Sequence, residues 1–125
     1  MESKEFRCGK LSLETFSGES SKTSTNDYLN ALTMDSSKHA SFSFLVYNQD
    51  VANGIICKVE VSNNPNDATP VWATYQDEAV VSALTTLKVS GVTVSNAVRI
   101  STKSQSAGNH AAFVTFGRLN PTLIF

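Results

Sequence analysis

Apolar and polar residues alternate over short runs along most of the chain, which is the spacing of strands with one face in a core and the other in water. In the segment 55–75, apolar residues occupy every second position from Ile55 to Val61. The turn-forming run Asn-Asn-Pro-Asn-Asp follows, and an apolar run resumes at Val71. This segment predicts a β-hairpin that carries the single tryptophan, Trp72.

The same alternation predicts strands on both sides of this hairpin. The segment 40–47 predicts a strand with a phenylalanine-rich inner face, and the turn dipeptide formed by Asn53 and Gly54 predicts a hairpin with the strand that starts at Ile55. Residues 76–78 indicate a polar break, and Ser90 with Gly91 indicates a turn. Further strands are expected at 79–89, 92–94, 97–102 and 111–116, with a loop at 104–110 before the last one.

The N-terminal part of the chain has a different composition, since residues 1–38 hold more than half of the charged side chains. We expect a first strand at 6–16, a polar flexible loop or arm at 17–27, and either a helical turn or a strand at 28–34. Residues 1–38 are therefore interpreted as a charged strand and arm that belong to the same domain as a β-sandwich body at 39–125.

Strands at intervals of about ten residues, without a sustained helical period, predict an all-β fold. The expected architecture is an antiparallel two-sheet sandwich, jelly-roll-like, with about eight short strands. A chain of 125 residues is long enough for one such domain. The segment 111–116 is apolar on both faces, which predicts a central strand or one covered by another subunit.

Charge and cysteine usage narrow the function. A net charge of −1 and a pI near 6.1 lack the basic face of nucleic-acid binders, so no nucleic-acid partner is expected. The chain starts without a signal-peptide pattern and has no transmembrane run, so we expect synthesis in a host cytoplasm and no membrane partner. Cys8 and Cys57 fit two buried reduced thiols, with a disulfide as the alternative.

No catalytic or metal-binding pattern stands out. His39 and His110 have no cysteine, histidine or carboxylate at ligand spacing, and no nucleophile elbow surrounds any serine. Asp77 and Glu78 are adjacent, so on a strand they point to opposite faces and cannot act as an acid–base pair. The sequence predicts no enzyme, no cofactor and no metal.

Five residues of the 55–75 hairpin are candidates for contact with a ligand or partner. Trp72 and Tyr75 are three positions apart on a strand and so face opposite sides. Core packing is the expected role of Trp72, and a sugar-stacking platform formed by either ring is the alternative. Asn63, Asn64 and Asp67 lie in the predicted loop, where polar groups could contact a partner or hydrogen-bond a sugar.

The C-terminal residues are a second candidate contact, because Leu123, Ile124 and Phe125 form an apolar tail. Such a tail gains most by docking, either onto a neighbouring subunit or onto its own sandwich, and otherwise frays. These three residues are therefore a candidate interface.

About half the chain carries three segments in a characteristic order: KVEVSNNPNDATPVWATY, LTTLKVSG and NAVRISTKSQSAGNHAAFVTF. In this order the segments resemble the small β-sandwich structural proteins of tailed bacteriophages, such as capsid decoration and minor virion proteins. The resemblance implies a non-enzymatic virion subunit without a cofactor. Its partners would be other virion proteins and further copies of itself, with a trimer as the expected form. A similar order of strands occurs in carbohydrate-binding sandwiches, which is the alternative reading; the resemblance does not cover residues 1–38.

Overall fold

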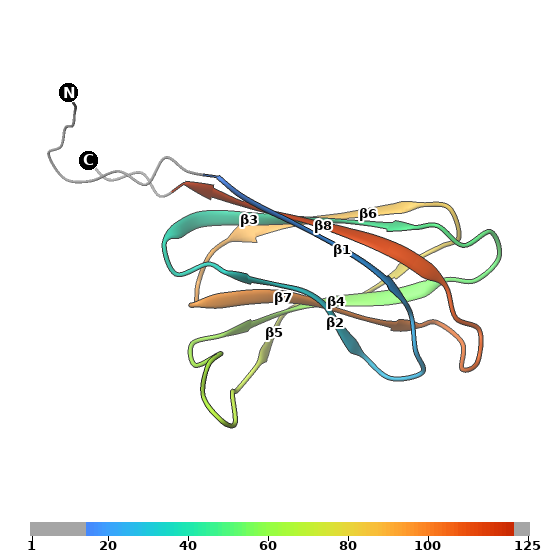
Figure 1. Ribbon diagram of the computed structural model, residues 1–125, viewed down its shortest axis with the longest axis horizontal. Coiled ribbons are helices and arrows are strands. Elements are labelled where there is room, and N and C mark those ends of the chain that lie inside the picture. Colours follow the sequence, from blue (N-terminus) through green and yellow to red (C-terminus); the bar gives the residue numbers. More distant parts are fainter. Residues whose placement is uncertain (1–14, 122–125) are drawn as a thin grey trace, which may run out of the picture.

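The computed structural model describes residues 15–121, which fold into eight antiparallel strands and no helix (Figure 1). The strands are β1 (Phe16–Thr23), β2 (Leu29–Asp35), β3 (His39–Asn48), β4 (Ile55–Ser62), β5 (Ala73–Val81), β6 (Thr86–Val92), β7 (Ala97–Ser104) and β8 (Ala112–Pro121). No helix in this part of the chain is long and apolar enough to cross a membrane.

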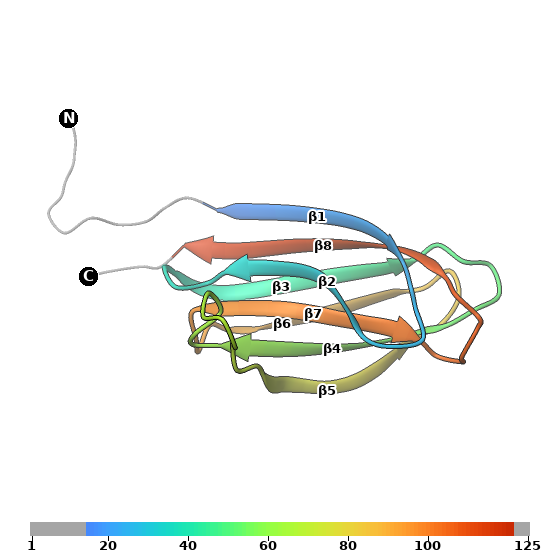
Figure 2. The ribbon, with the colours of Figure 1, turned by 60° about the horizontal axis from the view of Figure 1, so that its bottom comes forward.

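The strands form two sheets of four. Sheet 1 has the order β1-β8-β3-β6, and sheet 2 has the order β2-β7-β4-β5. The chain changes sheet at each connection between these strands except the β4–β5 hairpin, which pairs within sheet 2 (Figure 2). Two Greek keys wound in this way make a jelly roll, so the predicted all-β sandwich is confirmed.

Alternating side chains of the two sheets meet in one core. Phe42, Phe44 and Val46 of β3 are at most 1% exposed, as are Ile55 and Cys57 of β4. The intervening residues of β3 face outward, which is the inner-face pattern expected from the sequence. Burial raises the pKa of the Cys57 thiol to about 11, so Cys57 is a protonated core residue. Cys8 lies outside the described residues.

The predicted hairpin between 40–47 and the strand at Ile55 is wrong, because β3 and β4 belong to different sheets. The connection between them is held by the side chain of Asn48, which is fully buried. Its amide nitrogen donates to the carbonyl oxygens of Asn53 (2.9 Å) and Val81 (3.1 Å), and its oxygen accepts from the Asp50 amide (2.9 Å). Turn residues therefore mark a crossing between sheets here. Among residues 15–121, the glycine with a left-handed backbone is Gly108 (φ 80°) in the β7–β8 loop.

The segment 17–27, expected to be a flexible loop, is mostly strand. β1 pairs with β8 from Phe16 to Thr23 in a continuous antiparallel register. Its side chains are largely exposed because it is an edge strand, so backbone hydrogen bonds stabilise it without an apolar period in the sequence. The predicted strand at 6–16 lies almost entirely outside the described residues.

The other edge strands also depart from the sequence pattern. The expected break at 76–78 lies inside β5 and the expected turn at Ser90 and Gly91 lies inside β6. Gly91 faces the ring of Tyr75, and a Cβ there would lie 2.9 Å from two ring carbons. Gly91 is thus a packing residue, not a turn residue.

Two further expectations concern β2 and β8. The segment 28–34, for which a helical turn and a strand were both open, forms strand β2. β8 is central in sheet 1, as its two apolar faces predicted.

The two sheets approach closely where β1 and β8 face β2. Gly18 and Gly117 are directly paired across β1 and β8. A Cβ on Gly117 would lie 2.7 Å from Leu32 Cδ2 and from Met34 Sδ, whereas a Cβ on Gly18 would meet its neighbours at 3.4 Å or more. The absence of a side chain at Gly117 therefore lets β2 pack against the middle of sheet 1.

Candidate functional site

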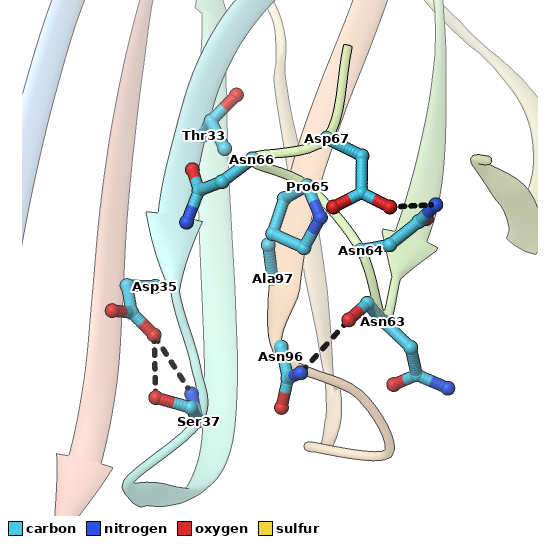
Figure 3. A pocket seen from close by; sticks show the side chains of 10 residues that line it. All are labelled: Thr33, Asp35, Ser37, Asn63, Asn64, Pro65, Asn66, Asp67, Asn96 and Ala97. Atoms are coloured by element: carbon cyan, nitrogen blue, oxygen red, sulfur yellow. Dashed lines mark hydrogen bonds between the residues drawn. The ribbon is translucent and has the colours of Figure 1, made fainter. Parts of the chain in front are cut away.

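A polar pocket of about 440 Å³ lies at the end of the sandwich where β1 begins and β8 ends. Three segments build it: the end of β2, the β4–β5 connection and the residues before β7 (Figure 3). Eight of its ten lining residues carry an amide, hydroxyl or carboxylate side chain, and the full lining is Thr33, Asp35, Ser37, Asn63, Asn64, Pro65, Asn66, Asp67, Asn96 and Ala97.

Asn64 organises the wall formed by the β4–β5 connection. Its side-chain oxygen accepts from the Val71 amide (2.9 Å) and from Ser62 Oγ (3.1 Å), and its nitrogen donates to Asp67 Oδ2 (3.1 Å). The Asn96 side chain donates to the Asn63 carbonyl at 2.9 Å and ties this wall to the start of β7. The predicted loop residues Asn63, Asn64 and Asp67 therefore do come together at one pocket, where Asn64 shapes the loop.

Asp35 forms the opposite wall. The hydroxyl and the amide of Ser37 donate to its carboxylate at 2.7 and 3.1 Å, and these hydrogen bonds lower the pKa of Asp35. Asp35 is therefore ionised at neutral pH and presents acceptors to the pocket. With amide donors facing it, the pocket can hydrogen-bond a polyhydroxyl ligand.

The two aromatic candidates lie elsewhere. Tyr75 points inward and packs edge-on against Phe42, with ring centroids 5.4 Å apart. Trp72 lies on the outer side of sheet 2, where its half-buried ring covers the Arg99 guanidinium at 4.0 Å. The two rings lie on opposite sides of the sheet, as expected. The prediction that Trp72 packs in the core is wrong, because Tyr75 is the ring that packs against the core. Neither ring lines the pocket, and the tail residues Leu123, Ile124 and Phe125 lie outside the described residues.

Arg99 also joins a charged cluster on the outer face of sheet 2. Glu60, only 8% exposed, accepts hydrogen bonds from Arg99 Nε (3.0 Å) and Ser101 Oγ (2.8 Å), and the Lys58 ammonium lies 3.7 Å away. Burial opposes ionisation of Glu60, but the hydrogen bonds and the two positive charges outweigh it, so its pKa is lowered.

This cluster should make stability depend on pH. Because the folded-state pKa of Glu60 is below the usual value of about 4.3, ionised Glu60 stabilises the fold above that value, and the contribution is lost as pH falls through the folded-state pKa. Between pH 6 and pH 3 the wild type should therefore lose more unfolding free energy than Glu60→Gln, by up to about 1 kcal/mol. Urea denaturation of both proteins at the two pH values measures this, and equal losses would contradict it.

A second aromatic residue, Tyr28, extends the cluster. The Lys58 and Lys103 ammonium groups lie 4.2 and 4.9 Å from the centre of its ring, and its hydroxyl donates to Glu78. Burial and this hydrogen bond raise the pKa of Tyr28. Both aromatic residues on this face are thus engaged by cations of the same sheet, which makes the face a stabilising network.

Sheet 1 presents a different outer face. Leu45 and Tyr47 of β3 and Phe116 of β8 are 41%, 38% and 43% exposed, although they stand on the two central strands of the sheet. Leu45 and Phe116 are direct cross-strand partners. The sequence indicated that 111–116 is apolar on both faces, but the position of Leu45 beside Phe116 follows only from the register. A polar outer face is usual for a sheet that meets water.

No catalytic constellation forms among residues 15–121. Ser104 Oγ lies 2.8 Å from His110 Nδ1, but Ser104 is 4% exposed and also bonds Ser24 Oγ at 2.7 Å, so these groups tie loops together at the end opposite the pocket. Within the same range there is no group of three or more histidine, cysteine or acidic residues that could hold a metal ion.

Neither a protein-family model nor a curated protein matches the sequence. Solved structures do match in fold. A Bacillus endospore appendage, from a family described as disulfide-linked pili, aligns over 93% of this chain and 97% of that chain with a TM-score of 0.55 and 11% identity. A protein chain in the structure of the infectious bursal disease virus Gx strain aligns over 92% of this chain with a TM-score of 0.54 and 11% identity. A protein of the T13 viral particle of the same virus aligns over 90% of this chain with a TM-score of 0.52 and 9% identity.

This chain spans 32% of the length of each matched viral protein. At such identities the similarity establishes the fold, a jelly roll that occurs in a pilus and in viral particles.

Proposed function

We propose that the chain is a non-enzymatic structural subunit of a bacteriophage particle, either a decoration protein or a minor head or tail protein. It acts through contacts with other virion proteins and with further copies of itself. The observation that carries the proposal is the exposed apolar side chains at the centre of sheet 1, since a contiguous apolar patch with a polar rim is the mark of a protein-binding surface. Its fold relatives in pili and viral particles are consistent with an assembly role.

Within this proposal the body at 39–125, together with β1 and β2 from the charged N-terminal part (1–38), supplies the sandwich scaffold. Leu123, Ile124 and Phe125 form a further contact to a neighbouring subunit, and three copies associate, as the resemblance to phage decoration proteins implies. The virion is then the place where the protein functions.

Mass spectrometry of purified phage particles from the source culture tests the proposal. The expected result is that peptides of this chain co-purify with the particles at a fixed ratio to the major coat protein. A matched preparation with residues 123–125 deleted should show weaker retention of the protein. Complete absence from washed particles would overturn the assignment.

A second candidate is a carbohydrate-binding module, favoured by the 440 Å³ pocket lined with amide and carboxylate groups. Here Asp35, Asn66 and Asp67 would hydrogen-bond sugar hydroxyls, without an aromatic platform, because Trp72 and Tyr75 do not line the pocket. Calorimetric titration with a panel of glycans tests it. Binding that is lost in Asp35→Asn but kept in the exposed control Asp77→Asn would support the pocket, and no heat across the panel would exclude it.

A further inference from the structure

The exposed apolar side chains at the centre of sheet 1 lie on its two central strands, β3 and β8. Along β3 and β8 the outward positions alternate with fully buried ones, such as Phe44, Val46 and Thr115. Tyr47 pairs with Val114 of β8 one register row beyond the pair Leu45 and Phe116. Two adjacent apolar pairs therefore lie at the centre of the sheet, and in the second pair Tyr47 is the exposed member because Val114 is only 9% exposed.

Charges flank the first of these pairs with opposite sign on the two sides. Glu19 of β1 is the partner of Phe116, and Lys88 of β6 is the partner of Leu45. Both charged residues are exposed. Read across the sheet, the row is acid, aromatic, aliphatic and base: Glu19, Phe116, Leu45 and Lys88.

This order is complementary to itself. When two copies face each other across a two-fold axis parallel to the strands and midway between β8 and β3, the row of one copy opposes the same row in reverse. Phe116 then faces Leu45 of the other copy, and Glu19 faces Lys88, and symmetry repeats each contact. In the next row Val114 would face Tyr47. Sheets packed face to face keep their strands within about 30° of alignment, so the central residues stay opposed.

We propose that the outer face of sheet 1 binds the outer face of sheet 1 of a second copy of this chain, through a two-fold contact centred on Leu45 and Phe116. The proposal deepens the assembly role above and rests on it. It selects a copy of the same chain because both the apolar centre and the charges at the rim find their complement on the same surface.

The shape of the surface allows such a contact. A shallow hollow of about 400 Å³ lies beside the apolar pair, and Glu19, Leu45, Phe116 and Arg118 are among its lining residues. The hollow can accept side chains from the second copy, with the Glu19 carboxylate at its border to meet Lys88. A two-fold contact on this face is compatible with the proposed trimer, since an assembly of two trimers contains both kinds of contact and has an even number of copies.

Charge reversal tests the contact with variants that keep the core intact, since Glu19 and Lys88 are both exposed. Sedimentation velocity over a concentration series should show an even-numbered oligomer for the full-length wild type. Glu19→Lys or Lys88→Glu alone places like charges together twice in each pair, so the dissociation constant should rise about tenfold or more. The double variant Glu19→Lys/Lys88→Glu restores opposite charges and should return to within about threefold of wild type.

Asp77→Lys on the exposed part of β5 is the control, because it makes the same change of charge away from sheet 1 and should leave association unchanged. A monomer at all concentrations, an odd-numbered oligomer that ignores both reversals, or a double variant as weak as the singles would overturn the two-fold contact. Each of these results leaves the presence of the protein in particles, measured by mass spectrometry, as a separate outcome.

Discussion

Asn48→Asp is expected to lower the free energy of unfolding by about 3–5 kcal/mol at pH 7. Asn48 is fully buried, and its amide nitrogen donates hydrogen bonds to the carbonyl oxygens of Asn53 and Val81. An aspartate has the same shape but cannot donate to these carbonyls when ionised. Both carbonyls would lose a donor, and a negative charge would be buried beside them.

Chemical denaturation at two pH values separates this cause from a general loss of packing. The folded-state pKa of the introduced carboxyl would be raised, so the penalty is full at pH 7 and shrinks toward pH 4, where a protonated carboxyl can donate one hydrogen bond. The difference from wild type should therefore be smaller at pH 4. Asn66→Asp, on the exposed β4–β5 connection, is the matched control and should change stability by less than about 0.5 kcal/mol. A pH-independent difference would contradict the proposed cause.

Gly117→Ala is expected to destabilise the fold by about 1–3 kcal/mol, although alanine is ordinarily the more stable choice in a strand. The added methyl would lie 2.7 Å from Leu32 Cδ2 and Met34 Sδ, both on the facing sheet. One of these side chains must leave its place, or β2 must move away from β8. Thermal and urea denaturation measure the cost.

Gly18→Ala provides the comparison, because Gly18 is the direct partner of Gly117 on the neighbouring strand. A methyl there meets its closest neighbour at 3.4 Å, which is ordinary contact. The loss of freedom in the unfolded chain then decides the outcome, so stability should stay equal or rise by up to about 1 kcal/mol. Equal destabilisation by the two substitutions would show that intersheet spacing is not the reason for Gly117.

The strands whose inner face is apolar were predictable from the sequence. β3, β4, β7 and β8 carry an apolar period, and they form the centres of the two sheets. Most of β1, the middle of β5 (76–78) and the end of β6 were not predicted, because edge strands are stabilised by one line of backbone hydrogen bonds and need no such period. Which strands pair with each other was harder to predict than where the strands lie, since turn residues such as Asn53 and Gly54 are equally compatible with a hairpin and with a crossing between sheets.

The candidate site was predictable only in part. Polar turn residues placed Asn63, Asn64 and Asp67 in one loop, but Asp35 and Asn96 join them through topology, which brings the end of β2 beside the β4–β5 connection. The position of Trp72 outside the core was not predictable, because Arg99, which is distant in sequence, places a cation against its ring on the outer face. The apolar patch on sheet 1 likewise needed the register between β3 and β8.

Because Phe16 pairs with Leu119, the start of β1 and the end of β8 lie at the same end of the sandwich, which is useful for protein engineering. A reporter attached before β1 or after β8 would stand at the pocket end of the molecule (Figure 1). The connections at 24–28, 49–54, 82–85 and 105–111 gather at the other end and are joined by backbone hydrogen bonds such as Ser104 to Thr25 and Gln105 to Gly54. A foreign epitope grafted at Ala107 or Gly108 would therefore be displayed on a hydrogen-bonded tip, facing away from any surface to which the opposite end is anchored.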